Sequence, residues 1–91
     1  MIFSFNLRGH HFECREEPYG LVLETYIGGW VVQLTVPYDN PTSLLNDEEL
    51  VKSWVASTGI PLTKTLTYLI HKYKTMKERQ EKRTNVYKRH G

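Results

Sequence analysis

Two adjacent glycines, Gly28 and Gly29, interrupt a stretch of apolar and β-branched residues, and no other feature limits the fold as strongly. The runs on either side cover residues 21–27 and 30–36. A two-residue turn of type I′ requires positive φ at both central positions, which glycine adopts without steric cost. The sequence therefore predicts a β-hairpin whose turn is formed by these two glycines.

Closing the hairpin at this turn predicts which side chains share each face of the two strands. The pairs on one face are nearly all apolar: Ile27 with Trp30, Thr25 with Val32, Leu23 with Leu34, and Leu21 with Val36. The pairs on the other face are half polar: Tyr26 with Val31, Glu24 with Gln33, and Val22 with Thr35. We expect the apolar face to be buried, which places Trp30 in the core, and the half-polar face to be accessible.

Period-two alternation also runs through the residues before the hairpin. Apolar and polar residues alternate over positions 3–7 and again over positions 10–15, with Arg8 and Gly9 between the two runs. These runs predict two further strands, joined at the Arg8 and Gly9 turn. The N-terminal half is then an antiparallel meander of three or four strands, and its apolar face needs a cover.

A first helix from the second half of the chain can supply part of this cover. Apolar residues between positions 44 and 55 fall at helical spacing. Asn40 can cap a helix that has Pro41 in its first turn, whereas Asn46 or Asp47 would cap a shorter helix. The sequence leaves both starting points open.

A second helix begins after Pro61, with Thr63 as its expected N-cap. Its apolar positions step by 4, 3, 4 and 3 residues, which is the spacing of one helix face. These positions are Leu62, Leu66, Leu69, Tyr73 and Met76. The predicted fold class is therefore α+β, with a small antiparallel sheet of three to four strands from the N-terminal half, covered on one face by two C-terminal helices.

The second helix is expected to outrun the domain that it covers. Its apolar stripe ends at Met76, yet good helix formers continue over positions 77–83, and pairs such as Lys77 with Glu81 would support them. Such a helix is roughly 34 Å long at ~1.5 Å per residue, so its end should project into solvent. We therefore divide the chain into a single α+β domain, residues 1–76, and a basic helical extension and tail, residues 77–91.

The net charge of +2 hides a split between the two ends of the chain. Nine of the 12 Lys and Arg residues lie at positions 64–91, which carry net +7, whereas positions 1–63 carry net −5. Such asymmetry indicates that the basic end contacts an anionic partner. Because basic side chains displace counterions from a phosphate backbone and an aromatic ring stacks on bases, we expect this end to bind nucleic acid. The candidate residues are Lys72, Lys74, Lys77, Arg79, Lys82, Arg83, Tyr87, Lys88 and Arg89.

Other interpretations of the basic end stay open, namely contact with an acidic protein surface and a solvated helix end that keeps the protein soluble. The rival function is a protein-binding module or inhibitor that docks on a larger enzyme or complex. It would use the helix extension or the half-polar sheet face around Val22, Tyr26 and Val31. Our first expectation is a small, non-enzymatic regulator that binds nucleic acid, of the kind that phages and mobile elements encode, and the sequence leaves a homodimer open.

His10, His11, Glu13 and Cys14 bring metal-capable and nucleophile-capable side chains within five residues. Alternate side chains of a strand point to opposite faces, which separates His10 and Cys14 from His11 and Glu13. Two ligands on a face do not complete a tetrahedral metal site. His10 could chemically serve as the general base for a Cys14 nucleophile. The sequence, however, shows neither an oxyanion hole nor a cause for a lowered pKa of the thiol. We expect no metal, no cofactor and no catalytic site.

The single cysteine excludes an internal disulfide framework and fits a reducing compartment. The first residues show no basic segment and no long apolar run, so we expect no signal peptide. No window approaches ~18 consecutive apolar residues, so we expect no membrane-spanning helix. These observations predict a cytoplasmic protein.

Residues 59–73 resemble the turn and second helix of ribbon-helix-helix repressors: Gly59 and Ile60 are followed by a threonine cap and by apolar positions that end at Tyr73. The resemblance implies DNA-binding regulation. We carry over no contact residues, because the strand that would pair across a dimer, residues 30–36, is engaged in the predicted hairpin. A helix-turn-helix fits the segment poorly, since Thr65 stands where a buried aliphatic residue is expected.

Overall fold

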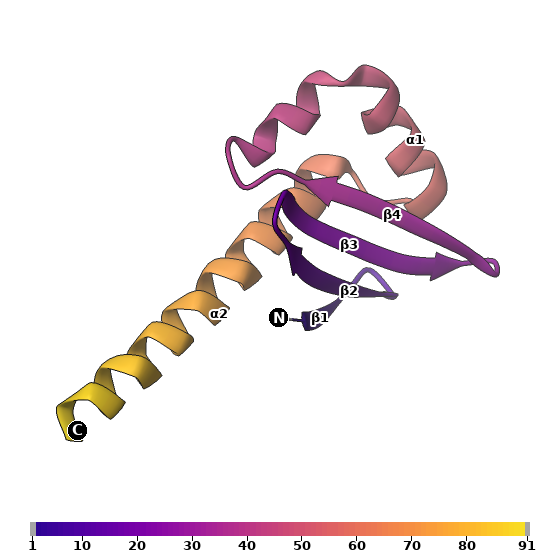
Figure 1. The fold of residues 1–91 in the computed structure, drawn as a ribbon. Coiled ribbons are helices and arrows are strands. Elements are labelled where there is room, and N and C mark those ends of the chain that lie inside the picture. Colours follow the sequence, from indigo (N-terminus) through magenta and orange to yellow (C-terminus); the bar gives the residue numbers. More distant parts are fainter. Residues whose placement is uncertain (1, 91) are drawn as a thin grey trace.

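The computed structural model describes the backbone of residues 2–90 and the side chains of residues 2–80. It has the predicted α+β fold, with a four-stranded antiparallel sheet followed by helices that lie on one face of the sheet (Figure 1). The strands are β1 (Ile2–Leu7), β2 (His10–Glu17), β3 (Gly20–Ile27) and β4 (Trp30–Val36). The helical elements are the 3₁₀ helix η1 (Pro41–Asn46), α1 (Glu48–Thr58) and α2 (Leu62–His90).

The sheet is a simple meander in the order β1-β2-β3-β4, so each strand pairs with its neighbours in sequence. The β3–β4 register agrees with the prediction at every position, from Ile27 opposite Trp30 to Leu21 opposite Val36. Gly28 has φ 57° and Gly29 has φ 83°, as a type I′ turn requires. The turn chemistry therefore determined both the hairpin and its register.

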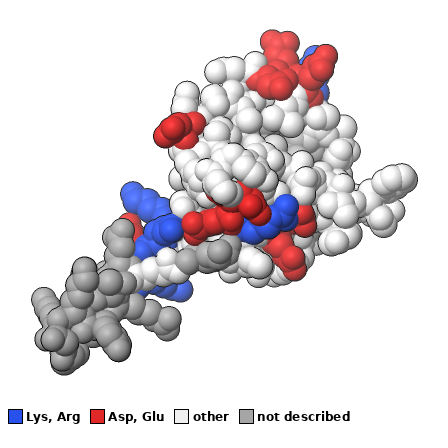
Figure 2. All heavy atoms as spheres, in the orientation of Figure 1, with Lys and Arg blue, Asp and Glu red and all other residues white. Residues whose placement is uncertain are grey.

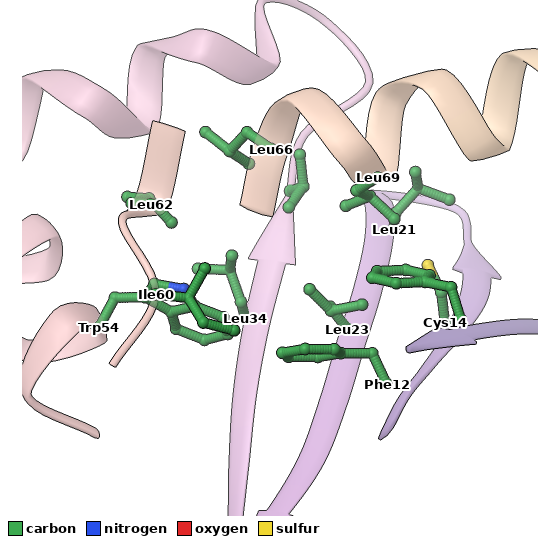
Figure 3. Packing of buried hydrophobic residues seen from close by; sticks show 12 residues of the cluster. Phe12, Cys14, Leu21, Leu23, Leu34, Trp54, Ile60, Leu62, Leu66 and Leu69 are labelled. Atoms are coloured by element: carbon green, nitrogen blue, oxygen red, sulfur yellow. The ribbon is translucent and has the colours of Figure 1, made fainter. Parts of the chain in front are cut away.

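The core forms where the first turns of α2 pack across the sheet. Leu62, Leu66 and Leu69 are each at most 1% exposed, and Figure 3 shows them above the sheet residues Phe12 and Leu23. Aromatic rings fill the space between these leucines and the sheet. The centroid of the Phe12 ring lies 5.3 Å from that of Phe5 and 6.2 Å from that of Trp54. The predicted stripe of α2 is thus its anchor in the core.

The structure has the shorter of the two predicted first helices, the one that begins after Asp47. Asn40 has a left-handed φ of 53° and its side chain caps nothing, and only the short helix η1 follows it. Asp47 caps α1 instead, because its carboxylate accepts the Leu50 N–H at 3.2 Å. The expected Thr63 cap of α2 is wrong, because α2 already begins at Leu62 and the Pro61 carbonyl accepts the first helical hydrogen bond, from Thr65.

The expectation that Trp30 is buried is wrong. Its side chain is 78% exposed, whereas Trp54 on α1 is 3% exposed. Trp30 does lie on the helix-facing side of the sheet, opposite Ile27, but it sits at the hairpin end, and Figure 1 shows that end extending beyond the helices. Alternation therefore identified its face correctly but not the limit of the helical cover.

A buried hydrogen bond joins the two α-helices, and its removal should destabilise the fold. The Trp54 Nε1–H donates to Thr65 Oγ1 at 2.9 Å, and Thr65 is fully buried. Thr65→Val keeps the volume but leaves the indole N–H without its acceptor, so we expect the free energy of unfolding to fall by about 1–3 kcal/mol. Chemical denaturation measures this loss.

Thr67→Val is the matched control for this prediction. Thr67 lies on the same helix, and its hydroxyl also donates to a carbonyl four residues earlier, but its side chain is exposed and bonds no other side chain in the described part of the protein. A loss of stability in Thr67→Val as large as that in Thr65→Val would contradict the role given to the Trp54 hydrogen bond.

Candidate nucleic-acid interface

Helix α2 is built from a buried first half and a second half that leaves the sheet. Side chains up to Leu69 are buried on the core side, Tyr73 and Met76 are half-buried, and Glu78 and Arg79 are exposed. The helix ends only at His90. The molecule consequently measures 51 × 27 × 21 Å, with α2 running along the long dimension (Figure 1).

Four of the nine predicted nucleic-acid-binding residues have described side chains. Lys72, Lys74 and Arg79 are exposed, and Lys77 is half-buried. Figure 2 shows basic side chains gathered along α2 where it leaves the domain. The other predicted residues have side chains outside the described ones: Lys82, Arg83, Tyr87, Lys88 and Arg89.

The four described basic residues do not form a single face. An α-helix turns by about 100° per residue, so Lys72 and Arg79, seven positions apart, lie on the same side of α2. Lys74 and Lys77, three positions apart, lie together on the other side, since two positions separate Lys74 from Lys72 by about 200°. The described basic residues of α2 therefore present positive charge along two opposite flanks of the helix.

Lys77 is partly used within the protein. Its Nζ lies 3.3 Å from Glu16 Oε2 on β2 and 5.5 Å from the centroid of the Tyr73 ring. The hydrogen bond to Glu16 raises the pKa of Lys77. This bond reaches across to the sheet, so Lys77 fastens α2 to the domain and is less available to a ligand than Lys74. The side chain of Glu81, the predicted helix partner of Lys77, lies outside the described ones.

Tyr38 strengthens the same attachment. Its hydroxyl donates to the Glu17 carbonyl, and its ring lies 6.4 Å from that of Tyr73. The sheet end that carries Glu16 and Glu17 is therefore tied to the middle of α2, and this fixes the direction in which the basic half leaves the domain.

The sheet face away from the helices carries a polar network at the position where the alternative protein interface was expected. Arg15 donates to Glu17 at 2.9 Å and to Glu24 at 2.6 Å, and Gln33 also donates to Glu24 at 2.6 Å. The hydrogen bond from Arg15 is the main cause that lowers the pKa of Glu24. Val22 lies opposite Arg15 in the register of β2 and β3, and it shares this face with Glu24, two residues along β3.

Two of the three residues of the alternative protein interface remain accessible. Val22 is 2% exposed and is not available to a partner, which corrects the expectation that it lines the surface. Tyr26 is 71% exposed and Val31 is 52% exposed, and they lie opposite each other at the hairpin end. Trp30, expected in the core, is a third exposed apolar side chain at that end.

The short run of histidine, glutamate and cysteine separates onto two faces as predicted. Cys14 lies in the core at 1% exposure, whereas His11 is exposed and bonds Asn6 at 3.0 Å. Burial, and secondarily the charge of Glu16, raises the pKa of the Cys14 thiol from 9.0 to about 12. No group of three or more metal-capable side chains occurs among the residues whose side chains are described. The arrangement therefore does not support a thiolate nucleophile at neutral pH.

Comparison with known proteins found no matching family model, no matching curated protein and no matching solved structure. Across the described residues, no helix combines the length and the hydrophobicity that crossing a bilayer requires.

Proposed function

We propose that this protein is a small, non-enzymatic intracellular regulator that binds nucleic acid through the basic half of α2. The observation that carries the proposal is that the helix anchored in the core continues past the sheet with exposed basic side chains, among them Lys72, Lys74 and Arg79. A rigidly anchored helix presents these charges in a constant direction, which a flexible tail does not. The free, buried Cys14 is compatible with a reducing compartment.

The distribution of charge on α2 favours a duplex over a single strand. Lys72 and Arg79 lie on one flank of the helix and Lys74 lies on the opposite flank, so the two sets cannot follow one phosphate backbone together. The major groove of B-form DNA admits an α-helix and has a phosphate backbone on each side. A-form RNA has a narrow major groove that does not admit a helix in this way. We therefore propose duplex DNA as the ligand.

Fluorescence anisotropy with random duplex and single-stranded oligonucleotides, at ~50 and ~200 mM salt, tests the proposal. We expect the duplex to bind more tightly and the logarithm of its affinity to fall linearly with the logarithm of salt concentration. The triple variant Lys72→Gln, Lys74→Gln, Arg79→Gln should lose affinity at least about tenfold at the lower salt. Its salt slope should be shallower by roughly 2–3, since each lost phosphate contact removes about 0.9.

The matched control removes three exposed basic residues that lie outside the second half of α2: Arg8→Gln, Lys52→Gln, Lys64→Gln. This control lowers the net charge by the same amount, so a purely global charge effect would weaken both variants alike. Equal losses in the two triple variants, or no duplex binding by the natural protein at ~50 mM salt, would show that the proposal is wrong.

The exposed apolar residues Tyr26, Trp30 and Val31 favour a second candidate function, a module that docks on another protein. An interface centred on these residues would be nearly insensitive to salt, because it contains no charge. The salt dependence of binding to whatever partner is isolated therefore separates the two candidates.

A further inference from the structure

Strand β4 lies at the edge of the sheet and exposes half of its backbone hydrogen-bonding groups. In a hairpin with a two-residue turn, Ile27 and Trp30 form the hydrogen-bonded pair next to the turn. The backbone N–H and C=O groups of every second residue of β4, starting at Trp30, therefore point to β3. A side chain at Gly20 would collide with the carbonyl oxygen of Val36, which confirms that this oxygen points to β3. The groups that point outward belong to Val31, Gln33 and Thr35.

These outward groups have no hydrogen-bond partner within the described part of the chain. The strand contains no charged residue, no proline and no bulge, and all seven of its residues are paired in register on the other side. Edge strands of monomeric proteins are normally protected by such features, because an open, regular edge pairs with another strand. The β4 edge is therefore built to receive a strand.

Strand β1 forms the opposite edge of the sheet and, like β4, contains no charged residue, although basic residues lie near it. Arg8 directly follows β1, and the Tyr68 ring packs on Phe5 of β1 with Lys72 Nζ 5.7 Å from its centroid. The β4 edge in addition carries exposed Trp30 and Val31, apolar side chains that a paired strand would cover.

We propose that β4 pairs antiparallel with β4 of a second copy of this chain, joining the two sheets into one across a two-fold axis at Gln33. In this register Gln33 faces its own counterpart, so the two side-chain amides can hydrogen bond. Val31 faces Thr35 of the other copy, a pair of β-branched residues that packs well across strands. On the helix side, exposed Trp30 comes next to Val36 of the other copy, so the pairing also covers an apolar side chain that the monomer leaves in water.

A second copy can pair with this edge better than an unrelated strand can. The side chains of Val31, Gln33 and Thr35 are complementary to the same three side chains of the other copy, and the pairing brings no two charges together. The inference does not depend on nucleic-acid binding. The basic half of α2 leaves the sheet at the end opposite to the hairpin turn (Figure 1), so dimer formation and ligand binding use separate surfaces and can fail separately.

Sedimentation velocity of the full chain over a wide range of concentration, combined with amide hydrogen exchange, tests the proposal. We expect the mass to rise from 10.7 kDa to twice that value as concentration increases. We also expect the amides of Val31, Gln33 and Thr35 to become protected over the same range, because they gain hydrogen bonds only in the dimer. A protein that stays monomeric, or a dimer whose formation leaves these three amides unprotected, would overturn the proposal.

Two variants block the edge without removing a hydrogen bond inside the chain. Thr35→Pro deletes an outward N–H, and Gln33→Lys can keep a bond to Glu24 while it places two positive charges at the two-fold axis. Each should raise the dimer dissociation constant at least about tenfold, whereas Thr35→Ala, which keeps the N–H and loses only the side-chain contact with Val31, should raise it by less than either blocking variant. If Thr35→Ala weakens the dimer as much as Thr35→Pro, or neither blocking variant weakens it, strand pairing is not the interface. Unfolding curves recorded on the same samples show whether each variant is folded. If Thr35→Pro does not fold, Gln33→Lys alone serves as the test.

Discussion

Phe12→Ala is expected to lower the free energy of unfolding by about 3–5 kcal/mol, the range for removing a buried aromatic ring. Phe12 is fully buried and its ring packs between Phe5 on β1 and Trp54 on α1, so it joins the sheet to the helical layer. Domains of this size have a total stability of roughly 5–15 kcal/mol, so the variant should be only marginally folded at 25 °C. Urea denaturation followed by circular dichroism measures the change.

Tyr26→Ala is the control, because it removes an aromatic ring from the same sheet at a position that is 71% exposed. We expect this variant to change the stability by at most about 0.5 kcal/mol. Similar losses in the two variants would mean that Phe12 does not occupy the centre of the core.

Cys14 is expected to react with a thiol reagent such as DTNB at least about a thousandfold more slowly than an exposed thiol at pH 8. Two causes act together. The side chain is only 1% exposed, and the rise of its pKa from 9.0 to about 12 lowers the fraction of reactive thiolate. Stopped-flow absorbance of the released thiolate measures the rate, and a denaturant should restore ordinary reactivity.

The reference thiol for this measurement is Ser57→Cys in a Cys14→Ala background, because Ser57 is exposed on α1. If native Cys14 and this reference thiol react at comparable rates, the burial of Cys14 is contradicted. Such a result would also reopen the catalytic interpretation of His10 and Cys14, which the geometry does not support.

The sheet could be predicted almost completely from the sequence because its signals are local. The pair Gly28 and Gly29 specified the turn, and once the turn was known the alternation of side chains specified the register of β3 and β4. The anchor of α2 was predictable for a similar reason, since the spacing of Leu62, Leu66 and Leu69 depends only on helix geometry.

The errors concern properties that depend on distant parts of the chain. Alternation assigns Trp30 to a face but does not say how far along the strand the helices reach. Alternation likewise places Val22 on the half-polar face but does not predict that its side chain is only 2% exposed there. The bond from Lys77 to Glu16, 61 positions earlier, was not predicted, because no rule about neighbours on a helix can find a contact so distant in sequence.

The order of elements along the chain has a consequence for how the protein is made. Helix α2 completes the core but begins roughly 25 residues after β4 ends, so at ~5–20 residues per second it leaves the ribosome roughly 1–5 s later. Hairpins form within microseconds, but the sheet gains the cover that stabilises it only when the start of α2 has been made. During that interval Phe5, Phe12 and Leu23 lack the helix that buries them in the finished protein, so we expect the sheet to become stable only when residues 62–69 emerge.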